Sequence, residues 1–172
     1  MIELIGPETI CMDLGASTKE EAIAKLADML DSAGKLRSRQ GYIKTVLERE
    51  ALTTTGIGMG IAIPHGKSAA VREAGIAFGK SACGIDWTSL DGQPTRLVFL
   101  LAVPEEAAGT QHLQILARLA RMLMDDGFRN DLMSATTPEK VLEVISRSEK
   151  GGDRSESTLG NTQKPPGKKT WE

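Results

Sequence analysis

The chain has 172 residues, of which 40% are hydrophobic and 26% are charged, so it is long enough for one domain with its own core. A formal net charge of -2, with no basic stretch interleaved with aromatic residues, gives no electrostatic support for nucleic-acid binding. The sequence contains no N-terminal signal and no apolar run of about 18 residues, so we expect a cytoplasmic protein with no direct membrane insertion.

The N-terminal part of the chain predicts two helices before a glycine-rich segment. Residues 17–20 fit a capping box, and apolar residues then recur at helical spacing as far as Gly34. A second helix is predicted over residues 38–51. Arg49 falls at the C-terminal end of the buried side of this helix, directly before the glycine-rich segment 53–67.

The segment 53–67 ends in a histidine that is set between proline and glycine. Its alternating glycines permit backbone conformations that are closed to other residues, and the apolar run 61–63 is typical of a strand. Pro64 cannot donate to a sheet ladder, so we expect it to end that strand and to present His65, followed by Gly66, at a strand end. Because much of the imidazole is unprotonated at neutral pH, His65 is a candidate nucleophile toward phosphorus or acyl centres.

The centre of the chain predicts a buried sheet. Residues 97–103 form the longest apolar run, and its lack of alternation predicts a strand that is buried on both faces, with helices on both sides of the sheet. A shorter strand is predicted at 76–78, and the turn residues around Asp91 separate the two. Thr110 is then expected to cap a helix on which His112 shares the face of Leu116, Leu119 and Leu123.

The C-terminal part predicts two more helices and then an unstructured segment. Gly127 and Asn130 interrupt the helical pattern, so a short helix is expected only over residues 131–134. The sequence Thr137-Pro138-Glu139 is typical of a helix start. From about residue 148 the composition shifts to Gly, Ser, Asn, Pro and Lys. We therefore expect a domain over residues 1–148 and a flexible tail or interdomain linker over 149–172.

Two residues have the chemistry to assist a phosphoryl group on His65. His112 lies in the first turn of its helix, where free backbone N–H groups and the helix dipole favour an anion, and on the stripe that faces the sheet. Arg49 has a planar guanidinium that matches phosphate oxygens. Each residue also has a structural interpretation: His112 as a polar cap on an amphipathic helix, and Arg49 as an ion-pair partner of Glu48 or Glu50.

Two other kinds of site are not supported by the sequence. Gly66-Lys67-Ser68 is similar to the end of a phosphate-binding P-loop, but Ile61 stands where that motif requires glycine, so we predict no nucleotide binding. Cys11 and Cys83 form no metal pattern with each other or with the two histidines. We expect both cysteines to be free, buried, small hydrophobes.

Several motifs in the same order carry a family resemblance. They are Glu50-x6-Ile57-Gly58-x2-Ile61-Ala62-Ile63-Pro64-His65-Gly66, Gly84-Ile85-Asp86-Trp87, Leu90-Asp91-Gly92-Gln93-Pro94, Leu100-Leu101-Ala102-Val103-Pro104 and His112-Leu113. Over about residues 1–148 the chain resembles the fructose/mannitol/nitrogen-regulatory class of phosphotransferase-system (PTS) enzyme IIA, most closely the fructose type.

The resemblance implies a fold, a relay of phosphoryl transfer and a role for each candidate residue. The fold is a single α/β domain, with a mixed β-sheet flanked by α-helices on both faces. His65 is phosphorylated by the phosphocarrier protein HPr and passes the phosphoryl group to an enzyme IIB, to which such domains are often fused along with IIC. His112 supports the reaction, and Arg49 stabilises the phosphoryl group. Neither a metal nor an organic cofactor is implied.

Two functions are compatible with this site, and a third is disfavoured. The motifs at 84–87 and 90–94 favour a fructose-type carrier of sugar uptake. A nitrogen-regulatory-type enzyme IIA, which controls partner proteins according to its phosphorylation state, would use the same histidine. A hydrolase that used both histidines would need a nucleophile pair that the sequence does not contain.

Overall fold

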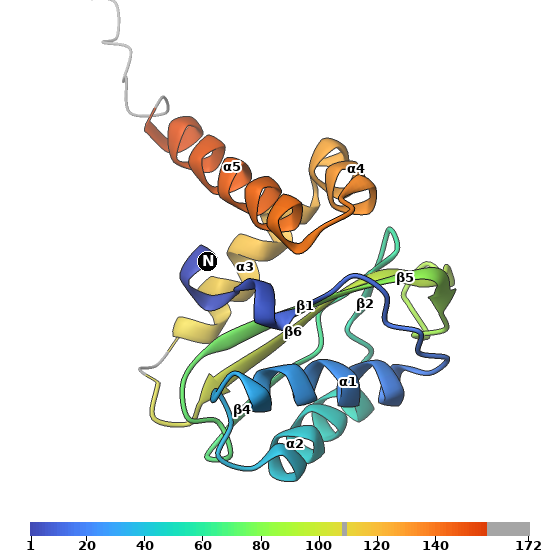
Figure 1. The fold of residues 1–172 in the computed structure, drawn as a ribbon, viewed down its shortest axis with the longest axis vertical. Helices are drawn as coiled ribbons and strands as arrows, with labels where there is room; N and C mark the ends of the chain where they lie inside the picture. Colours follow the sequence, from blue (N-terminus) through green and yellow to red (C-terminus); the bar gives the residue numbers. More distant parts are fainter. Residues whose placement is uncertain (108–109, 158–172) are drawn as a thin grey trace, which may run out of the picture.

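A mixed sheet separates two layers of helices in the computed structural model, which describes residues 1–107 and 110–157 (Figure 1). The sheet contains β1 (Ile10–Cys11), β2 (Gly56–Gly58), β3 (Ile61–Ala62), β4 (His65–Ser68), β5 (Gly75–Ile85) and β6 (Thr95–Pro104). The α-helices are α1 (Lys19–Ser32), α2 (Arg39–Leu52), α3 (Gln111–Leu123), α4 (Asp126–Ser134) and α5 (Pro138–Ser157), and two short 3-10 helices are η1 (Ile2–Leu4) and η2 (Pro7–Thr9). The predicted α/β class, with a mixed sheet and helices on both faces, is confirmed.

Strand β6 organises the sheet. It pairs with β5 in antiparallel fashion on one side, and with both β3 and β4 in parallel fashion on the other. Ile61 of β3 is in register with Leu97, and His65 of β4 is in register with Leu101, so the two short strands follow one another along the same edge of β6. β1 lies beside β5 in parallel, and β2 lies beside β3 in antiparallel fashion. The strand predicted at residues 97–103 is thus the centre of the sheet.

The two faces of β6 belong to two separate hydrophobic clusters. Residues Leu97, Phe99, Leu101 and Val103 pack with the side chains of α3, α4 and α5. The alternate residues Val98, Leu100 and Ala102 pack with α1 and α2. Because residues in register on parallel neighbours share a face, His65 projects toward the α3 side and Gly66 toward α2.

Two helix starts differ from the sequence prediction. The N-cap of α1 is Thr18, one residue later than predicted, and it accepts a hydrogen bond from the Glu21 amide. The Glu21 carboxylate accepts from the amide of Ser17, the residue before the cap, so the reciprocal bond of a capping box is replaced by one to its neighbour. α4 begins at Asp126 rather than at residue 131, because the Asp125 side chain caps it by accepting from the Gly127 amide. The cap and the burial of this helix against the core outweigh the low helix propensity of the glycine inside it.

Other predictions hold at the level of the element but differ in detail. Thr110 occupies the N-cap position of α3, although its side chain makes no capping hydrogen bond. α5 continues past residue 148 to Ser157, so the first part of the segment expected as a tail or linker is helical; residues 158–172 lie outside the described residues.

Both cysteines are free, but Cys83 is exposed and Cys11 half-buried, so the expectation that they are buried was wrong. No helix in the described part of the chain is long and apolar enough to cross a membrane.

Candidate active site

His65 begins β4, directly after the break at Pro64. β3 ends at Ala62, as the proline predicted, but His65 opens a following strand instead of standing at the end of the first one. The break is fixed by hydrogen bonds on both sides, since the Ile63 amide donates to the Thr55 carbonyl and the Leu101 amide donates to the Pro64 carbonyl, each at 3.0 Å. The backbone therefore presents His65 from a strand that is hydrogen-bonded to the centre of the sheet.

Gly66 allows α2 to lie against the strand that carries His65. A Cβ at this position would lie 3.1 Å from Cγ2 of Val46 and 3.3 Å from Cε2 of Tyr42, both on α2. The buried Tyr42 hydroxyl also donates to the Leu101 carbonyl at 2.7 Å, and Leu101 is the register partner of His65. The glycine after the histidine thus serves close packing of α2, whose last turn contains Arg49.

One nitrogen of the His65 imidazole is already engaged. Nδ1 lies 2.9 Å from the carbonyl oxygen of Ile63, and because a carbonyl only accepts, Nδ1 carries the proton. Partial burial lowers the pKa of the imidazole below its ordinary value of 6.5. The charges of Arg49 and His112 lower it further, while the bond to Ile63 and the charge of Glu50 act in the opposite direction. The ring is therefore neutral at neutral pH, with its lone pair on Nε2.

The structure brings the two predicted supporting residues to His65 from opposite layers. Arg49 comes from the last turn of α2 and His112 from the first turn of α3, and both lie close enough for their charges to act on the imidazole. The Arg49 guanidinium donates from Nη1 to the Thr53 carbonyl at 3.0 Å. Within the described residues it forms no ion pair with Glu48 or Glu50, which was the alternative interpretation of this arginine.

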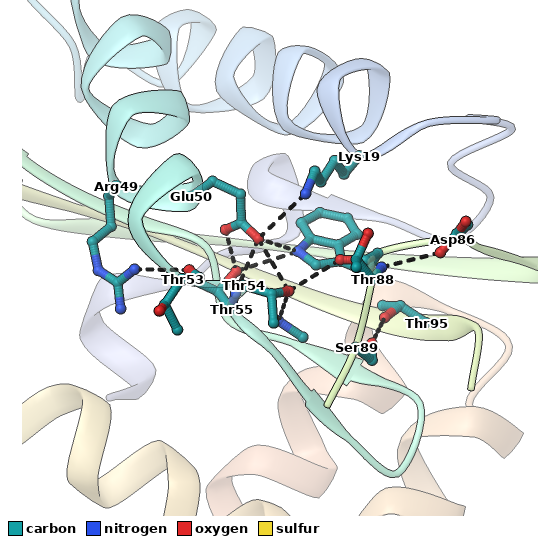
Figure 2. A network of polar contacts seen from close by, with 12 residues as sticks. Lys19, Arg49, Glu50, Thr53, Thr54, Thr55, Asp86, Thr88, Ser89 and Thr95 are labelled. Atoms are coloured by element: carbon teal, nitrogen blue, oxygen red, sulfur yellow. Dashed lines mark hydrogen bonds and ion pairs between the residues drawn. The ribbon is translucent and has the colours of Figure 1, made fainter. Parts of the chain in front are cut away.

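A buried polar network lies beside Arg49 and was not predicted from the sequence (Figure 2). The Glu50 carboxylate accepts hydrogen bonds from the amide and hydroxyl of Thr55 and from the indole N–H of Trp87. Glu50 and Trp87 are 37 residues apart, so no local pattern connects them. The only sequence signal is that Glu50 opens the matched signature and that Trp87 ends one of the downstream motifs.

Apolar side chains next to the supporting residues are exposed. Leu52, which ends α2, is 80% exposed, and Leu113, which follows His112, is 54% exposed. Among the described residues, no group of three or more His, Cys, Asp or Glu side chains could hold a metal ion. The candidate site therefore consists of one neutral imidazole and two side chains with N–H donors, and exposed leucines follow each of those two side chains in the sequence.

The comparison with protein families gives one match over most of the chain. Residues 3–148 match the family described as "Phosphoenolpyruvate-dependent sugar phosphotransferase system, EIIA 2". This range contains every element from η2 to α4 and the first half of α5, together with all three candidate residues.

Curated relatives are similar over the same part of the chain. A "PTS system fructose-specific EIIABC component" of Bacillus subtilis is 43% identical over 148 residues, which cover 86% of this chain and 23% of that protein. A "PTS system fructose-specific EIIA component" of Haloferax volcanii is 41% identical over 139 residues, which cover 81% of this chain and 90% of that protein. The chain thus spans about a quarter of the first relative and nearly all of the second.

Solved structures share the fold. The nitrogen regulatory protein IIA-Ntr from Neisseria meningitidis superposes with a TM-score of 0.77 at 31% identity, covering 84% of this chain and 97% of that one. The enzyme IIA of the Escherichia coli mannitol system, solved in complex with its phosphorylated enzyme IIB, superposes with a TM-score of 0.71 at 29% identity. That match covers 83% of this chain and 96% of that one.

Proposed function

Because the chain belongs to the EIIA 2 family of the phosphoenolpyruvate-dependent sugar phosphotransferase system, we propose that it is a cytoplasmic phosphoryl carrier. It accepts a phosphoryl group from phospho-HPr on His65 and passes it to a sugar-specific enzyme IIB. The names of the two relatives favour fructose as the sugar. The observation that carries the proposal is the hydrogen bond from His65 Nδ1 to the Ile63 carbonyl, which leaves Nε2 as the nucleophilic nitrogen.

The transfer needs no proton movement at His65. The Nε2 lone pair forms a bond to phosphorus while the bond from phosphorus to the donor nitrogen breaks, and the donor leaves as an imidazole. The proton on Nδ1 stays in place, because the Ile63 carbonyl accepts from it before and after transfer and stabilises the positive charge that develops on the ring. Transfer to enzyme IIB breaks the new bond as the acceptor nucleophile attacks phosphorus from the opposite side.

Arg49 and His112 stabilise the charge of the phosphoryl oxygens. A guanidinium has several N–H donors, so the bond from Arg49 to Thr53 leaves capacity for a phosphoryl oxygen. His112 supplies an imidazole N–H from the N-terminal turn of α3, where the helix dipole also favours an anion. In phosphoryl transfer, placement and electrostatic stabilisation provide most of the catalysis, which fits a site made of donors around one nucleophile.

The names of similar proteins support an enzyme IIB as the partner that accepts the phosphoryl group. The EIIABC architecture of the Bacillus subtilis relative joins a region similar to this chain to further components, and the mannitol enzyme IIA binds a phosphorylated enzyme IIB. The exposed Leu52, at the end of the helix that contains Arg49, and Leu113, which follows His112, offer apolar surface to such a partner. We therefore propose enzyme IIB as the acceptor, on the same chain or on a separate one.

A reconstituted relay tests the proposal. The protein is incubated with phosphoenolpyruvate, enzyme I and HPr, and phosphorylation is followed by mass spectrometry. Since the chain has only two histidines, the His65→Ala and His112→Ala variants form a matched pair. We expect no phosphorylation of His65→Ala and slower but complete phosphorylation of His112→Ala. Phosphorylation of His65→Ala at the wild-type rate would refute the assignment of the acceptor.

The nitrogen-regulatory function is the second candidate, favoured by the similarity to IIA-Ntr. A protein of that type would use the same phosphorylated histidine to control partner proteins. The two functions differ in the acceptor. Transfer from the phosphorylated protein to a fructose-type enzyme IIB supports the carrier, and no transfer supports the regulatory function.

A further inference from the structure

Glu50 is a buried acid at the C-terminal end of α2. Its side chain is 3% exposed, and its carboxylate accepts from the Thr55 amide at 2.9 Å, the Thr55 hydroxyl at 2.6 Å and the Trp87 indole at 2.9 Å. Lys19 on α1 lies 3.9 Å away (Figure 2). Both carboxylate oxygens are therefore hydrogen-bonded, as a buried charge requires.

This position is unfavourable for the helix itself. An acid in the last turn faces the negative end of the helix dipole, and burial removes its charge from water. Thr88, which follows the indole donor Trp87, is also strained, because it is a β-branched residue with a φ of 57°. Local costs of this kind persist where the surrounding structure fixes a functional geometry. A contribution to the stability of α2 therefore does not explain why a buried glutamate occupies this position.

Glu50 fixes the segment that connects α2 to β2. Thr55 is held by its amide and by its hydroxyl, and the Thr54 hydroxyl donates to the Trp87 carbonyl at 3.0 Å and accepts from the Gly56 amide. The carbonyl of Thr53, at the start of the same segment, accepts from the Arg49 guanidinium. Figure 2 shows Arg49 and Glu50 reaching this threonine segment from the same helix. By holding this segment, Glu50 also fixes the position of the Thr53 carbonyl, to which Arg49 donates.

The same segment is connected to His65 by an unbroken series of hydrogen bonds. Thr55, whose amide is bound by Glu50, accepts at its carbonyl from the Ile63 amide at 3.0 Å. Ile63 in turn accepts at its carbonyl from Nδ1 of His65 at 2.9 Å. One carboxylate thus fixes both the anchor of Arg49 and the acceptor that orients the imidazole.

We propose that Glu50 is a positioning residue for phosphoryl transfer, which holds Arg49 and His65 in their relative places through the segment 53–55. The inference rests on the proposed function, in which His65 accepts the phosphoryl group and Arg49 stabilises it. Within the described residues, none of the hydrogen bonds of Glu50 goes to His65, so it acts through Thr53, Thr55 and Ile63. Its role depends on reach and hydrogen bonding, not on its charge.

Two conservative variants separate reach from charge. Glu50→Gln keeps the length of the side chain: its amide oxygen can accept from the Thr55 amide and from Trp87, and its amide group can donate to the rotatable Thr55 hydroxyl. Glu50→Asp keeps the charge but is one methylene shorter, so it withdraws the acceptor oxygens from Thr55. Glu48→Ala is the matched control, because it removes an exposed acid from the same helix.

The rate of phosphoryl transfer from phospho-HPr is measured for these variants at an alkaline pH, where His65 is neutral in all of them. We expect Glu50→Asp to lower kcat about tenfold with an unchanged KM for phospho-HPr, because misplaced groups slow the chemical step while a buried residue touches no partner. Glu50→Gln and Glu48→Ala should stay within about twofold of wild type. Equal slowing of Glu50→Gln and Glu50→Asp, or no slowing of Glu50→Asp, would overturn the inference.

A second measurement does not require the relay. Nitrogen NMR of the imidazole reports which ring nitrogen holds the proton, and we expect the Nδ1–H form of His65 in the wild type and in Glu50→Gln, with a mixture of tautomers in Glu50→Asp. An unchanged tautomer in Glu50→Asp contradicts the inference. If Glu50→Asp does not fold, Thr55→Val, which removes only the hydroxyl bonded to Oε2, should slow transfer in the same direction by a smaller factor. A wild-type rate for Thr55→Val would then overturn the inference.

The two proposals fail in different ways. If the wild type takes no phosphoryl group from phospho-HPr, the proposed function is wrong, and the tautomer measurement still tests whether Glu50 orients His65. If the wild type is phosphorylated and the Glu50 variants behave alike, the proposed function stands and the positioning role is wrong.

Discussion

The two residues that flank His65 are held in different ways. Arg49 is bonded to the Thr53 carbonyl, and the segment that follows is fixed by the buried network of Glu50. His112 lies in the first turn of α3, whose N-cap residue makes no capping hydrogen bond and whose next residue, Leu113, is largely exposed. Among the described residues, the α2 side of the site is therefore the more firmly hydrogen-bonded one, and we expect the α3 side to adjust more readily to a phosphoryl group or a partner.

Among the predicted effects, removal of Arg49 from the α2 side should change the rate of phosphoryl transfer most. Arg49→Ala deletes a preorganised donor, and we expect the rate of phosphoryl transfer to fall about 100-fold. Arg49→Lys should recover little of the rate, because an ammonium lacks the planar fork that bonds Thr53 and a phosphoryl oxygen together. Single-turnover rates with phospho-HPr provide the measurement, and a lysine variant as fast as wild type would show that charge alone is sufficient.

Removal of His112 should have a smaller effect, because it belongs to the less constrained side. We expect His112→Ala to slow transfer about tenfold with the fold intact. His112→Gln, which keeps an N–H donor, should restore part of the rate if the imidazole acts as a donor. Circular dichroism controls for folding. A slowing as large as that of Arg49→Ala would remove the distinction between the two sides.

Gly66→Ala tests the packing that keeps α2 in place. The added methyl group would lie 3.1 Å from Cγ2 of Val46, so α2 has to shift slightly, and we expect a loss of about 1–3 kcal/mol in the free energy of unfolding. Urea denaturation measures this loss. Gly151→Ala, in α5 with no atom within 4 Å of the added methyl, is the control and should be neutral or slightly stabilising. Equal stabilities for the two variants would show that α2 does not need this glycine.

The smallest predicted effect is on the pKa of His65. Since the charge of Arg49 lowers this pKa more than that of His112, Arg49→Ala should raise it further than His112→Ala does, as measured by NMR titration. The wild-type rate of phosphoryl acceptance should be constant near neutral pH and should fall only as the pH drops below the lowered pKa, where Nε2 becomes protonated. A decline in rate that begins above the ordinary value of 6.5 would contradict the assigned direction.

Local patterns predicted those parts of the fold that depend on neighbouring residues. The apolar run at 97–103 predicted β6, and the relation of Arg49 to His65 followed from their short separation in the chain. The start of α4 was missed because the cap from Asp125 and burial against the core outweigh the propensity of Gly127. The bond from Trp87 to Glu50 could not be predicted, since only the folded sheet brings these residues together.

The backbone bonds on both sides of Pro64 have a consequence for the energetics of turnover. Ile63 is tied to Thr55, and Pro64 to Leu101, so the chain around His65 is held before any phosphoryl group arrives. Gain and loss of that group can then occur without rearrangement of the main chain. If His65 carries the phosphoryl group as proposed, we expect little reorganisation of the main chain in either direction of transfer, so that loading and unloading of the imidazole have similar barriers.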